Sequence, residues 1–572
     1  MTRGSSTDGG ETKTSGSCIT VAITASSEKA ALLDQISEAY EGDDPRVRGR
    51  CVDIKVTSKS SGGAAEALAR GWDDAVDGPR PDVWSPASSG WVVILQQRLA
   101  AKDQPGMVPD ELPHVAETPL VIAMPRPMAQ AMGWPDKEIG WSDILSLSRD
   151  PAGWGKLGHP EWGAFRLGKT NPNFSTSGLN ATIGAYFAAT GRSSDLTEAD
   201  IADPKVVDFV KGVESSVVHY GDITLTFLEN LQKADDKGQG LTYISAVTVE
   251  EKSVWDYNKG NPTGDPKTLG KHAPPRTPLV AVYPKEGTLL SDNPYTVLNA
   301  PWVDDAKKEA AADFLKFLQR KEQQARFQKF AFRDFSGKAG SEIKPSNGLI
   351  PAEPRTKIAP PSPQVLDKIQ QSWAQLRKRA RVLMIIDVSG SMGQSVPKSG
   401  ETKLALAQRA AVNALAQFAP DDQLGLWAFS SDMQGNQPFL ELVPISPVSE
   451  RLDDLKQKIS GLAPRGGTGL YATTRAAARK MQEGFEPSRI NAIVLLTDGK
   501  NEYPRDTDLA GLLRELQSEG EDSAVRVFPI AYGDDADLGI LKQIAEASRA
   551  AAYDAADPAS IDKVFTAVVS NF

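Results

Sequence analysis

The chain has 572 residues and a net charge of −10; 40 % of its residues are apolar and 24 % are charged. This length predicts about three or four domains, and the composition is that of ordinary globular proteins. The mild negative charge and the lack of a lysine- or arginine-rich block argue against a nucleic-acid partner. No apolar run in the sequence approaches the ~20 residues that would cross a bilayer.

Residues 1–17 contain almost no apolar side chains and are rich in Ser, Thr and Gly. The segment lacks the hydrophobic centre of a secretion signal, and its composition predicts a flexible tether. We hypothesise that a secretion signal, and with it a lipid-attachment cysteine, was removed upstream. The alternative is the disordered N-terminus of a cytosolic protein.

The two cysteines open two similar strand-like segments, Cys18 in CITVAIT and Cys51 in CVDIKVT. Neighbouring parallel strands lie ~4.8 Å apart, which is within the separation that a disulfide spans. We therefore expect a Cys18–Cys51 disulfide, with a pair of free buried thiols as the alternative. Because disulfides persist outside the cytosol, the expected pairing favours an exported protein.

Residues 18–100 alternate between strand and helix signals, which predicts a parallel sheet flanked by helices. Each predicted strand ends in a pair of serines, at positions 26–27, 60–61 and 88–89. Serine is a good helix N-cap, and helix N-termini that converge at one sheet edge also form an anion-binding site. Both interpretations fit these serines.

Two nearly identical apolar strands, TPLVIAMP at 118–125 and TPLVAVYP at 277–284, bracket a region with its own strand and helix signals. Such a pair resembles the crossovers of a two-lobed, hinge-bending protein. Here the chain resembles the bacterial extracellular solute-binding proteins with two crossing strands. The resemblance implies a first lobe made of residues 18–123 and 278–345 and a second lobe made of residues 124–277.

The same resemblance implies a cleft for a small solute, touched by serine turns of the first lobe and an Asn/Ser turn of the second. The cleft residues that it implies are Ser27, Ser61, Ser89, Asn173, Ser175, Ser177 and Ser245. A cleft rich in serines and poor in basic side chains would suit a neutral solute or a tetrahedral oxyanion.

After a predicted helical hairpin at 301–330, the proline-rich stretch at 349–364 predicts an extended, semi-rigid linker. Residues 365–379 then predict an amphipathic helix. We place this linker and helix together at 346–378, between the two lobes and a last domain at 379–572.

The last domain again alternates strands with helices, which predicts a doubly wound, Rossmann-like α/β fold. Strands are predicted at 381–386, 423–429, 491–498 and 525–533, with an edge strand near 439–445, and helices at 403–418, 471–485 and 509–518.

Polar side chains follow two of these strands and precede one helix. Asp387, Ser389 and Ser391 alternate after the strand RVLMII, so an extended chain points them the same way. Thr468 begins a predicted helix, and Asp498 ends a buried strand. Open α/β sheets bind ligands at the carboxyl ends of their strands, and hard oxygen donors suit a magnesium-like cation. The five residues resemble the complete metal-ion-dependent adhesion site of von Willebrand factor type A domains.

This second resemblance implies that Ser389, Ser391 and Thr468 bind Mg²⁺, or another divalent cation such as Mn²⁺ or Ca²⁺, directly. Asp387 and Asp498 would act largely through water. A position at the cation would be left for a carboxylate of a protein partner. The alternative is a degenerate site whose residues serve only as turns and caps.

Catalytic signatures are absent from the sequence. The segment at 467–472 satisfies the dinucleotide fingerprint G-x-G-x-x-A, but no buried strand precedes it. The four histidines are scattered over the first half, and there is no H-E-x-x-H, G-x-x-x-x-G-K or G-x-S-x-G motif. We therefore expect a binding protein and not an enzyme.

The leading hypothesis is a secreted or surface-anchored bacterial protein, extracellular and attached by lipid, whose type A domain captures an acidic group of a partner in adhesion. One alternative is the receptor of an ABC importer with an accessory type A domain. Another is an intracellular, metal-chelatase-like subunit that works with an ATPase, which free thiols at both cysteines would favour.

Overall fold

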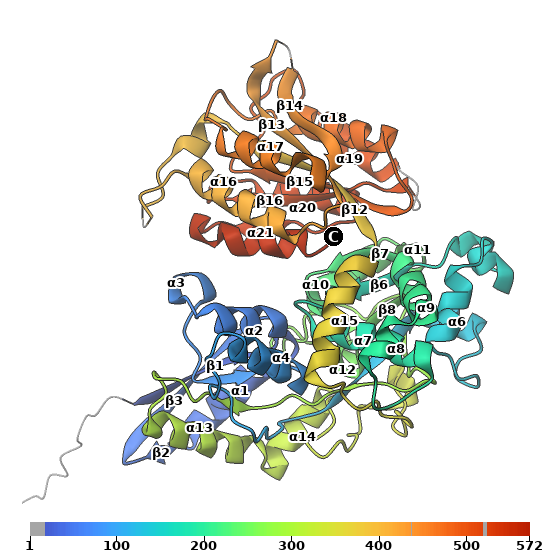
Figure 1. The fold of residues 1–572 in the computed structure, drawn as a ribbon, viewed down its shortest axis with the longest axis vertical. Coiled ribbons are helices and arrows are strands. Elements are labelled where there is room, and N and C mark those ends of the chain that lie inside the picture. Colours follow the sequence, from blue (N-terminus) through green and yellow to red (C-terminus); the bar gives the residue numbers. More distant parts are fainter. Residues whose placement is uncertain (1–17, 398, 436, 519–522) are drawn as a thin grey trace, which may run out of the picture.

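The structure is a computed structural model that describes residues 18–397, 399–435, 437–518 and 523–572. The tether predicted for residues 1–17 lies outside these ranges. The described residues form three sheets with flanking helices. Figure 1 shows two α/β lobes side by side and a third α/β domain beyond them. No helix within the described ranges combines the length and the apolar character that a membrane span requires.

The first lobe contains a five-stranded sheet in the order β11-β4-β1-β3-β2. Its strands are β1 (Ile19–Ala25), β2 (Arg46–Val47), β3 (Arg50–Ser58), β4 (Val83–Ser85) and β11 (Thr296–Val297). Its helices are α1 (Ser27–Gly42), α2 (Ser61–Arg70), α3 (Asp74–Asp77), α4 (Ser89–Ala100), α13 (Asp305–Leu318) and α14 (Lys321–Lys329). The strand β1 is parallel to both β3 and β4, as the alternation of strand and helix signals predicts.

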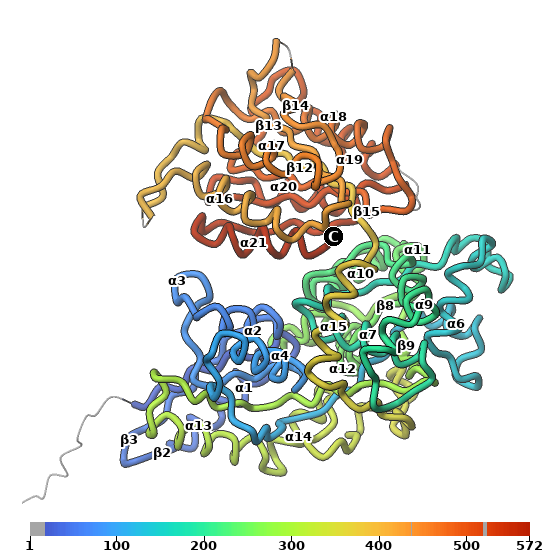
Figure 2. Tube along the Cα trace, viewed as in Figure 1, coloured from blue at the N-terminus to red at the C-terminus, as the bar shows by residue number. Residues whose placement is uncertain are grey.

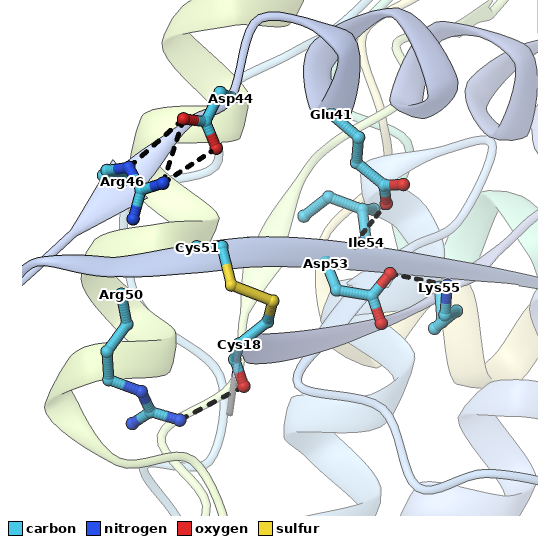
Figure 3. The surroundings of a disulfide bond; sticks show 9 residues. All are labelled: Cys18, Glu41, Asp44, Arg46, Arg50, Cys51, Asp53, Ile54 and Lys55. Carbon is cyan, nitrogen blue, oxygen red and sulfur yellow. Dashed lines mark hydrogen bonds and ion pairs between the residues drawn. A yellow bond between two sulfur atoms is a disulfide. The ribbon is translucent and has the colours of Figure 1, made fainter. Parts of the chain in front are cut away.

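The predicted disulfide is confirmed. Cys18, which directly precedes β1, is bonded to Cys51 in β3, and their Cα atoms lie 4.6 Å apart (Figure 3). The two strands pair in register beside the bond, with Ile19 opposite Val52. Arg50 donates a hydrogen bond to the carbonyl oxygen of Cys18 at 3.1 Å. The disulfide therefore ties the first strand of the chain to the sheet at its amino end.

The second lobe contains a six-stranded sheet in the order β10-β5-β8-β6-β7, with β9 paired to β5. Its strands are β5 (Thr118–Pro125), β6 (Leu167–Thr170), β7 (Val217–Gly221), β8 (Ala246–Glu250), β9 (Leu279–Val282) and β10 (Leu290–Ser291). Its helices are α5 (Arg126–Ala131), α6 (Trp141–Ser148), α7 (Thr176–Thr190), α8 (Glu198–Ala202), α9 (Pro204–Ser215), α10 (Thr224–Asp236), α11 (Gly240–Tyr243) and α12 (Glu251–Asn258). The two repeated segments of the sequence become neighbours, because β5 and β9 pair antiparallel with Ile122 opposite Val282.

The proline-rich linker runs without a helix through 348–362, with one isolated β-bridge between Thr288 and Lys357. The helix α15 (Pro363–Leu376) follows. It begins slightly earlier than the sequence predicts, because Ser362 caps it by accepting the N–H of Val365 and proline fits the first helical turn.

The C-terminal domain contains a six-stranded sheet in the order β14-β13-β12-β15-β16-β17. Its strands are β12 (Arg379–Asp387), β13 (Gln423–Gln434), β14 (Gln437–Pro447), β15 (Arg489–Thr497), β16 (Arg526–Tyr532) and β17 (Tyr553–Ala555). Its helices are α16 (Lys403–Ala414), α17 (Val448–Ser460), α18 (Leu470–Glu483), α19 (Leu509–Ser518), α20 (Leu538–Ala547) and α21 (Ile561–Val569). The predicted edge strand is β14, which is antiparallel to β13, whereas the other neighbouring strands are parallel.

The central strand β12 is buried on both faces, which explains its uninterrupted apolar sequence. Val382, Met384 and Ile386 pack into one core with α16, α17 and α21. Leu383 and Ile385 pack into the other with α18, α19 and α20. The domain is therefore doubly wound, as predicted.

The C-terminal domain contacts the second lobe through the last residues of the chain (Figure 2). The backbone N–H of Tyr220 in β7 donates to the carbonyl oxygen of Asn571 at 3.1 Å, and Asn171 donates to that of Ser570 at 3.1 Å. The strand β12 starts beside this contact, after α15. Its nine residues then carry the chain to the opposite edge of the sheet, where the candidate metal residues lie.

Removing the disulfide should destabilise the first lobe. The bond joins residues 33 positions apart, and closing such a loop stabilises by roughly 3–4 kcal/mol. The free energy of unfolding of the variant Cys18→Ser/Cys51→Ser should be lower by about this amount. The measurement is urea unfolding, monitored by the hydrogen exchange of the amides of β1 and β3. Wild-type protein in reductant should show the same loss, and an unchanged midpoint in both would contradict the prediction.

Candidate functional site

Asp387 ends β12 and is fully buried. One of its carboxylate oxygens accepts the backbone N–H of Ser389 at 2.7 Å. The other accepts the hydroxyl of Thr497, the last residue of β15, at 2.6 Å. The carboxylate therefore fixes the turn after β12 to the end of the neighbouring strand.

Two serine hydroxyls from this turn meet the carboxylate of Asp498, which follows β15. The Oγ atoms of Ser389 and Ser391 lie 3.0 Å apart. Ser391 donates to Oδ1 of Asp498 at 2.7 Å, and the Oγ of Ser389 lies 3.4 Å from the same oxygen. Three residues from two strand ends thus direct their oxygens to one point.

Thr468 reaches the same place from the turn before α18. It lines, together with Ser389, Ser391 and Asp498, a cavity of about 730 Å³. Gly499 is needed for this approach, because a Cβ at position 499 would lie 2.5 Å from the Thr468 hydroxyl oxygen. The structure therefore gathers four of the five predicted residues in one cavity, and Asp387 supports them without lining it.

The sequence analysis missed Lys403, the first residue of α16. Its ammonium lies 3.0 Å from Oδ2 of Asp498 and is only 10 % exposed. Tyr532 holds the backbone there by donating its hydroxyl to the carbonyl oxygen of Lys403 at 2.9 Å. No sequence motif predicts this lysine, because its role depends on how the N-terminus of α16 packs against the carboxyl end of β15.

The donor set fits a small, hard divalent cation, since hydroxyl and carboxylate oxygens are the ligands that Mg²⁺ and Ca²⁺ prefer. Within the described ranges, no group of three or more His, Cys, Asp or Glu side chains could hold a metal ion. The site instead combines two carboxylates with three hydroxyls.

The electrostatics of the site centre on Asp387. Burial raises the pKa of its carboxyl to about 7, and the nearby Asp498 carboxylate acts in the same direction. The hydrogen bonds from Thr497 and Ser389 lower the pKa and only partly offset the burial. Without a cation, the folded domain therefore favours the neutral form of the Asp387 carboxyl.

Of the predicted cleft residues, Ser61 and Asn173 lie where the lobes touch. Ser61 accepts the N–H of Ala87 at 3.1 Å and the hydroxyl of Thr176, from the second lobe, at 3.3 Å. The carbonyl oxygen of Asn173 would lie 2.1 Å from a Cβ at Gly62. The serine turn of one lobe and the Asn/Ser turn of the other are thus in direct contact.

The other predicted cleft residues of the second lobe are engaged inside that lobe. The hydroxyl of Ser177 lies 2.8 Å from that of Thr170 and 3.2 Å from that of Ser175. Ser245 accepts the indole N–H of Trp154 at 2.8 Å. All of these hydroxyls are buried.

In the first lobe, Ser27 and Ser89 are the first residues of α1 and α4. The N–H of Ser89 donates to Asp292 at 2.7 Å. Both serines therefore lie at helix N-termini, as the sequence predicts, and the partner of Ser89 lies in the segment that connects β10 of the second lobe to β11 of the first.

The metal-free C-terminal domain should lose stability as the pH rises from about 4 to about 7. The Asp387 carboxyl is protonated in both folded and unfolded chains below its ordinary pKa of 3.8, and only the folded chain retains the proton up to about 7. The loss should be on the order of 4 kcal/mol, because each pKa unit corresponds to about 1.4 kcal/mol. Hydrogen exchange of β12 in a chelator measures it.

The matched variant for this pH series is Asp387→Asn, which keeps the side-chain shape and cannot ionise. Its β12 amides should show a smaller loss of protection over the same pH range. Equal losses in wild type and variant would assign the pH dependence to other groups.

Known families match both parts of the chain. A family profile described as bacterial extracellular solute-binding protein matches residues 21–333, and one described as von Willebrand factor type A domain matches residues 382–567. An uncharacterized protein of Mycobacterium tuberculosis is 24 % identical over 549 residues, which cover 92 % of this chain and 73 % of that protein. Inter-alpha-trypsin inhibitor heavy chain H4 of Bos taurus is 32 % identical over 124 residues, 21 % of this chain and 12 % of its own length.

Solved structures similar to the chain fall into the same two groups. A periplasmic thiamin binding protein is 10 % identical with a TM-score of 0.42, over 63 % of this chain and 96 % of its own. A von Willebrand factor type A protein from Catenulispora acidiphila is 22 % identical with a TM-score of 0.28, over 34 % of this chain and 42 % of its own. The two family profiles show that the chain belongs to the bacterial extracellular solute-binding protein family and carries a von Willebrand factor type A domain at residues 382–567.

Proposed function

We propose that this protein is a secreted or surface-anchored bacterial binding protein whose type A domain captures an acidic group of a protein partner with a divalent cation. The observation that carries the proposal is the meeting of the Ser389 and Ser391 hydroxyls with the Asp498 carboxylate in an open cavity that Thr468 also lines. Hard oxygen donors from separate strand ends suit a cation that must also remain accessible to a partner.

The residues have distinct roles in this proposal. Ser389, Ser391 and Thr468 would hold Mg²⁺, Mn²⁺ or Ca²⁺ directly, and Asp387 and Asp498 would hold it largely through water. The cation would supply positive charge and a coordination position for an anionic oxygen. Asp387 fixes the turn that aims the two serines, through its bonds to Ser389 and Thr497.

The charge around the cavity supports cation dependence. The lining residues include the exposed carboxylates of Glu502, Asp534 and Asp535, against one exposed cation, Lys500. The carboxylates that line the cavity repel the carboxylate of a partner, so an acidic partner needs a bound cation to approach.

The extracellular location is supported by the family and by the disulfide. The matching family is one of extracellular proteins, and Cys18 and Cys51 are paired. Because disulfides are rare in the cytosol, the pairing disfavours the intracellular, chelatase-like alternative, which free thiols would have favoured. Lipid attachment stays a hypothesis.

The receptor of an ABC importer remains the second candidate, since residues 21–333 match a solute-binding family. In that case the cleft would bind a small solute and the type A domain would be accessory. The motion of the lobes separates the two candidates, because a solute receptor closes around its ligand by a hinge motion.

Replacing Asp498 should abolish cation-dependent binding. Asp498→Asn removes the charge on which both serine hydroxyls converge and should weaken Mn²⁺ binding, measured by electron paramagnetic resonance, at least 100-fold. On a peptide array, the wild type should bind Asp- or Glu-containing peptides in Mg²⁺ and release them in chelator, while matched Asn or Gln peptides stay unbound.

The control is Asp453→Asn, on the exposed surface of α17, which should behave as the wild type. Equal retention of acidic peptides with Mg²⁺ and with chelator would contradict the proposed function, whatever the variants do.

Replacing Lys403 should tighten cation binding while destabilising the metal-free domain. Lys403→Met removes an ammonium that lies 3.0 Å from the Asp498 carboxylate. This ammonium would repel a bound cation, and without a cation it compensates the charge of the buried carboxylate. We expect at least fivefold tighter Mn²⁺ binding. Urea unfolding in chelator should show a loss of about 3–5 kcal/mol, the cost of leaving a buried charge unpaired.

Lys500→Met is the matched control, because Lys500 lines the same cavity and is exposed. This variant should change neither the Mn²⁺ affinity nor the free energy of unfolding by much. Weaker Mn²⁺ binding by Lys403→Met would show instead that the lysine is needed to position Asp498.

A further inference from the structure

The two lobes of the solute-binding unit contact each other at the N-termini of three helices. The N–H of Gly62, in the first turn of α2, donates to the carbonyl oxygen of Phe174 at 2.9 Å. Trp91 of α4 donates its indole N–H to the hydroxyl of Thr176, the first residue of α7, at 2.9 Å. A backbone carbonyl of the second lobe therefore accepts one of the free N–H groups at the N-terminus of a helix in the first lobe.

This contact leaves no room for a side chain at position 62. A Cβ there would lie 2.1 Å from the carbonyl oxygen of Asn173 and 2.7 Å from the Cα of Phe174. It would also lie 2.6 Å from the ring of Trp91. Glycine thus permits the second lobe's backbone to approach α2 directly.

The helix α15 lies along the joint between the lobes. In Figures 1 and 2 it runs between α4 of the first lobe and α7 and α9 of the second. It contacts all three helices and α8. Its buried residues Leu366 and Ile369 belong to one apolar core with Leu95 of α4 and Ile183 of α7. Separating the lobes would expose this shared core to water.

The carboxyl end of α15 is fixed to the second lobe by a buried polar group. Glu214 is fully buried and accepts the indole N–H of Trp373 at 3.1 Å and the hydroxyl of Tyr220 at 2.6 Å. Lys169 completes its environment as a buried ion-pair partner. Tyr186 of α7 also donates its hydroxyl to Ser372 at 2.7 Å.

The same end of α15 is joined to the type A domain. Arg377 forms a buried ion pair with Asp422 and donates to the carbonyl oxygen of Phe572 at 2.9 Å. The N–H of Lys378 donates to the hydroxyl of Tyr220 at 3.2 Å. The second lobe, α15 and the type A domain are therefore linked by buried polar contacts, and the first lobe meets α15 through α4.

We infer that α15 is an intramolecular strap that holds the two lobes closed, so that the solute-binding unit serves as a fixed support for the type A domain and not as a receptor that opens and closes. A solute receptor works by hinge closure around its ligand. Here the lobes are held together by contacts of the chain itself, through α15 and through the Gly62–Phe174 hydrogen bond. The inference does not depend on the metal site.

The test measures the distance between the lobes in the full chain. Spin labels attached at Gln104→Cys in the first lobe and Glu198→Cys in the second use two exposed positions, and the native cysteines are already paired. Double electron–electron resonance should give one narrow distance distribution for the wild type. An additional, longer distance in the wild type would overturn the inference, because it would show lobes that open freely.

The strap is tested with two substitutions on opposite faces of α15. Ile369→Lys places a charge in the shared core and should add a longer distance for at least a fifth of the molecules. Ala374→Lys places the same charge on the exposed face and should keep the narrow distribution. A narrow distribution for folded Ile369→Lys would overturn the role of α15.

A second pair covers the case in which Ile369→Lys fails to fold. Gly62→Ala inserts a methyl group between the lobes and should also add a longer distance. Its control is Gly90→Ala, in the first turn of α4, where the nearest atom to a new Cβ is Ser88 Oγ at 3.5 Å. A narrow distribution for both glycine variants would show that the lobe contact yields without opening, and would overturn the inference.

Discussion

The burial of β12 between two apolar cores is the constraint on which the rest of the structure depends. Alternate residues of the strand fill the core on each face, so the strand cannot slide or rotate without exposing one set. Its two ends are therefore fixed in space. Asp387 emerges at one edge of the sheet beside Thr497, and Arg377, just before the other end, meets Asp422. The candidate cation site and the domain junction therefore lie at the two ends of one strand.

The sequence predicts those features that a local pattern determines. An unbroken apolar run announces a strand buried on both faces, and the matching segments after Cys18 and Cys51 announce strands in register. The meeting of Ser389 and Ser391 with Asp498 was likewise predictable, because parallel strands bring their carboxyl ends to one edge. Lys403 was not predictable, since it approaches Asp498 through the packing of α16 against the sheet.

The same limit explains what the sequence could not tell about the lobes. The amphipathic pattern of α15 shows which face is buried, but it does not show that this face packs against both α4 and α7. Serine turns are equally compatible with capping, ligand binding and packing. In the structure, Ser177 and Ser245 hydrogen-bond within the second lobe, whereas Ser61 bonds across the joint. Only the tertiary contacts distinguish these roles.

The position of the junction also has a mechanical consequence. A partner held at the candidate cation site would pull on Asp387 and its turn. The chain is anchored at the opposite end of β12, where Arg377 joins α15 to Phe572 and Asn571 joins the second lobe through Tyr220. Tension would then run lengthwise through β12, whose ladders with β13 and β15 lie on both sides of it. Pulling along a strand loads these ladders in shear, so their hydrogen bonds resist together instead of separating one after another. In the proposed function, this arrangement would help the domain to stay folded while force acts on a bound partner.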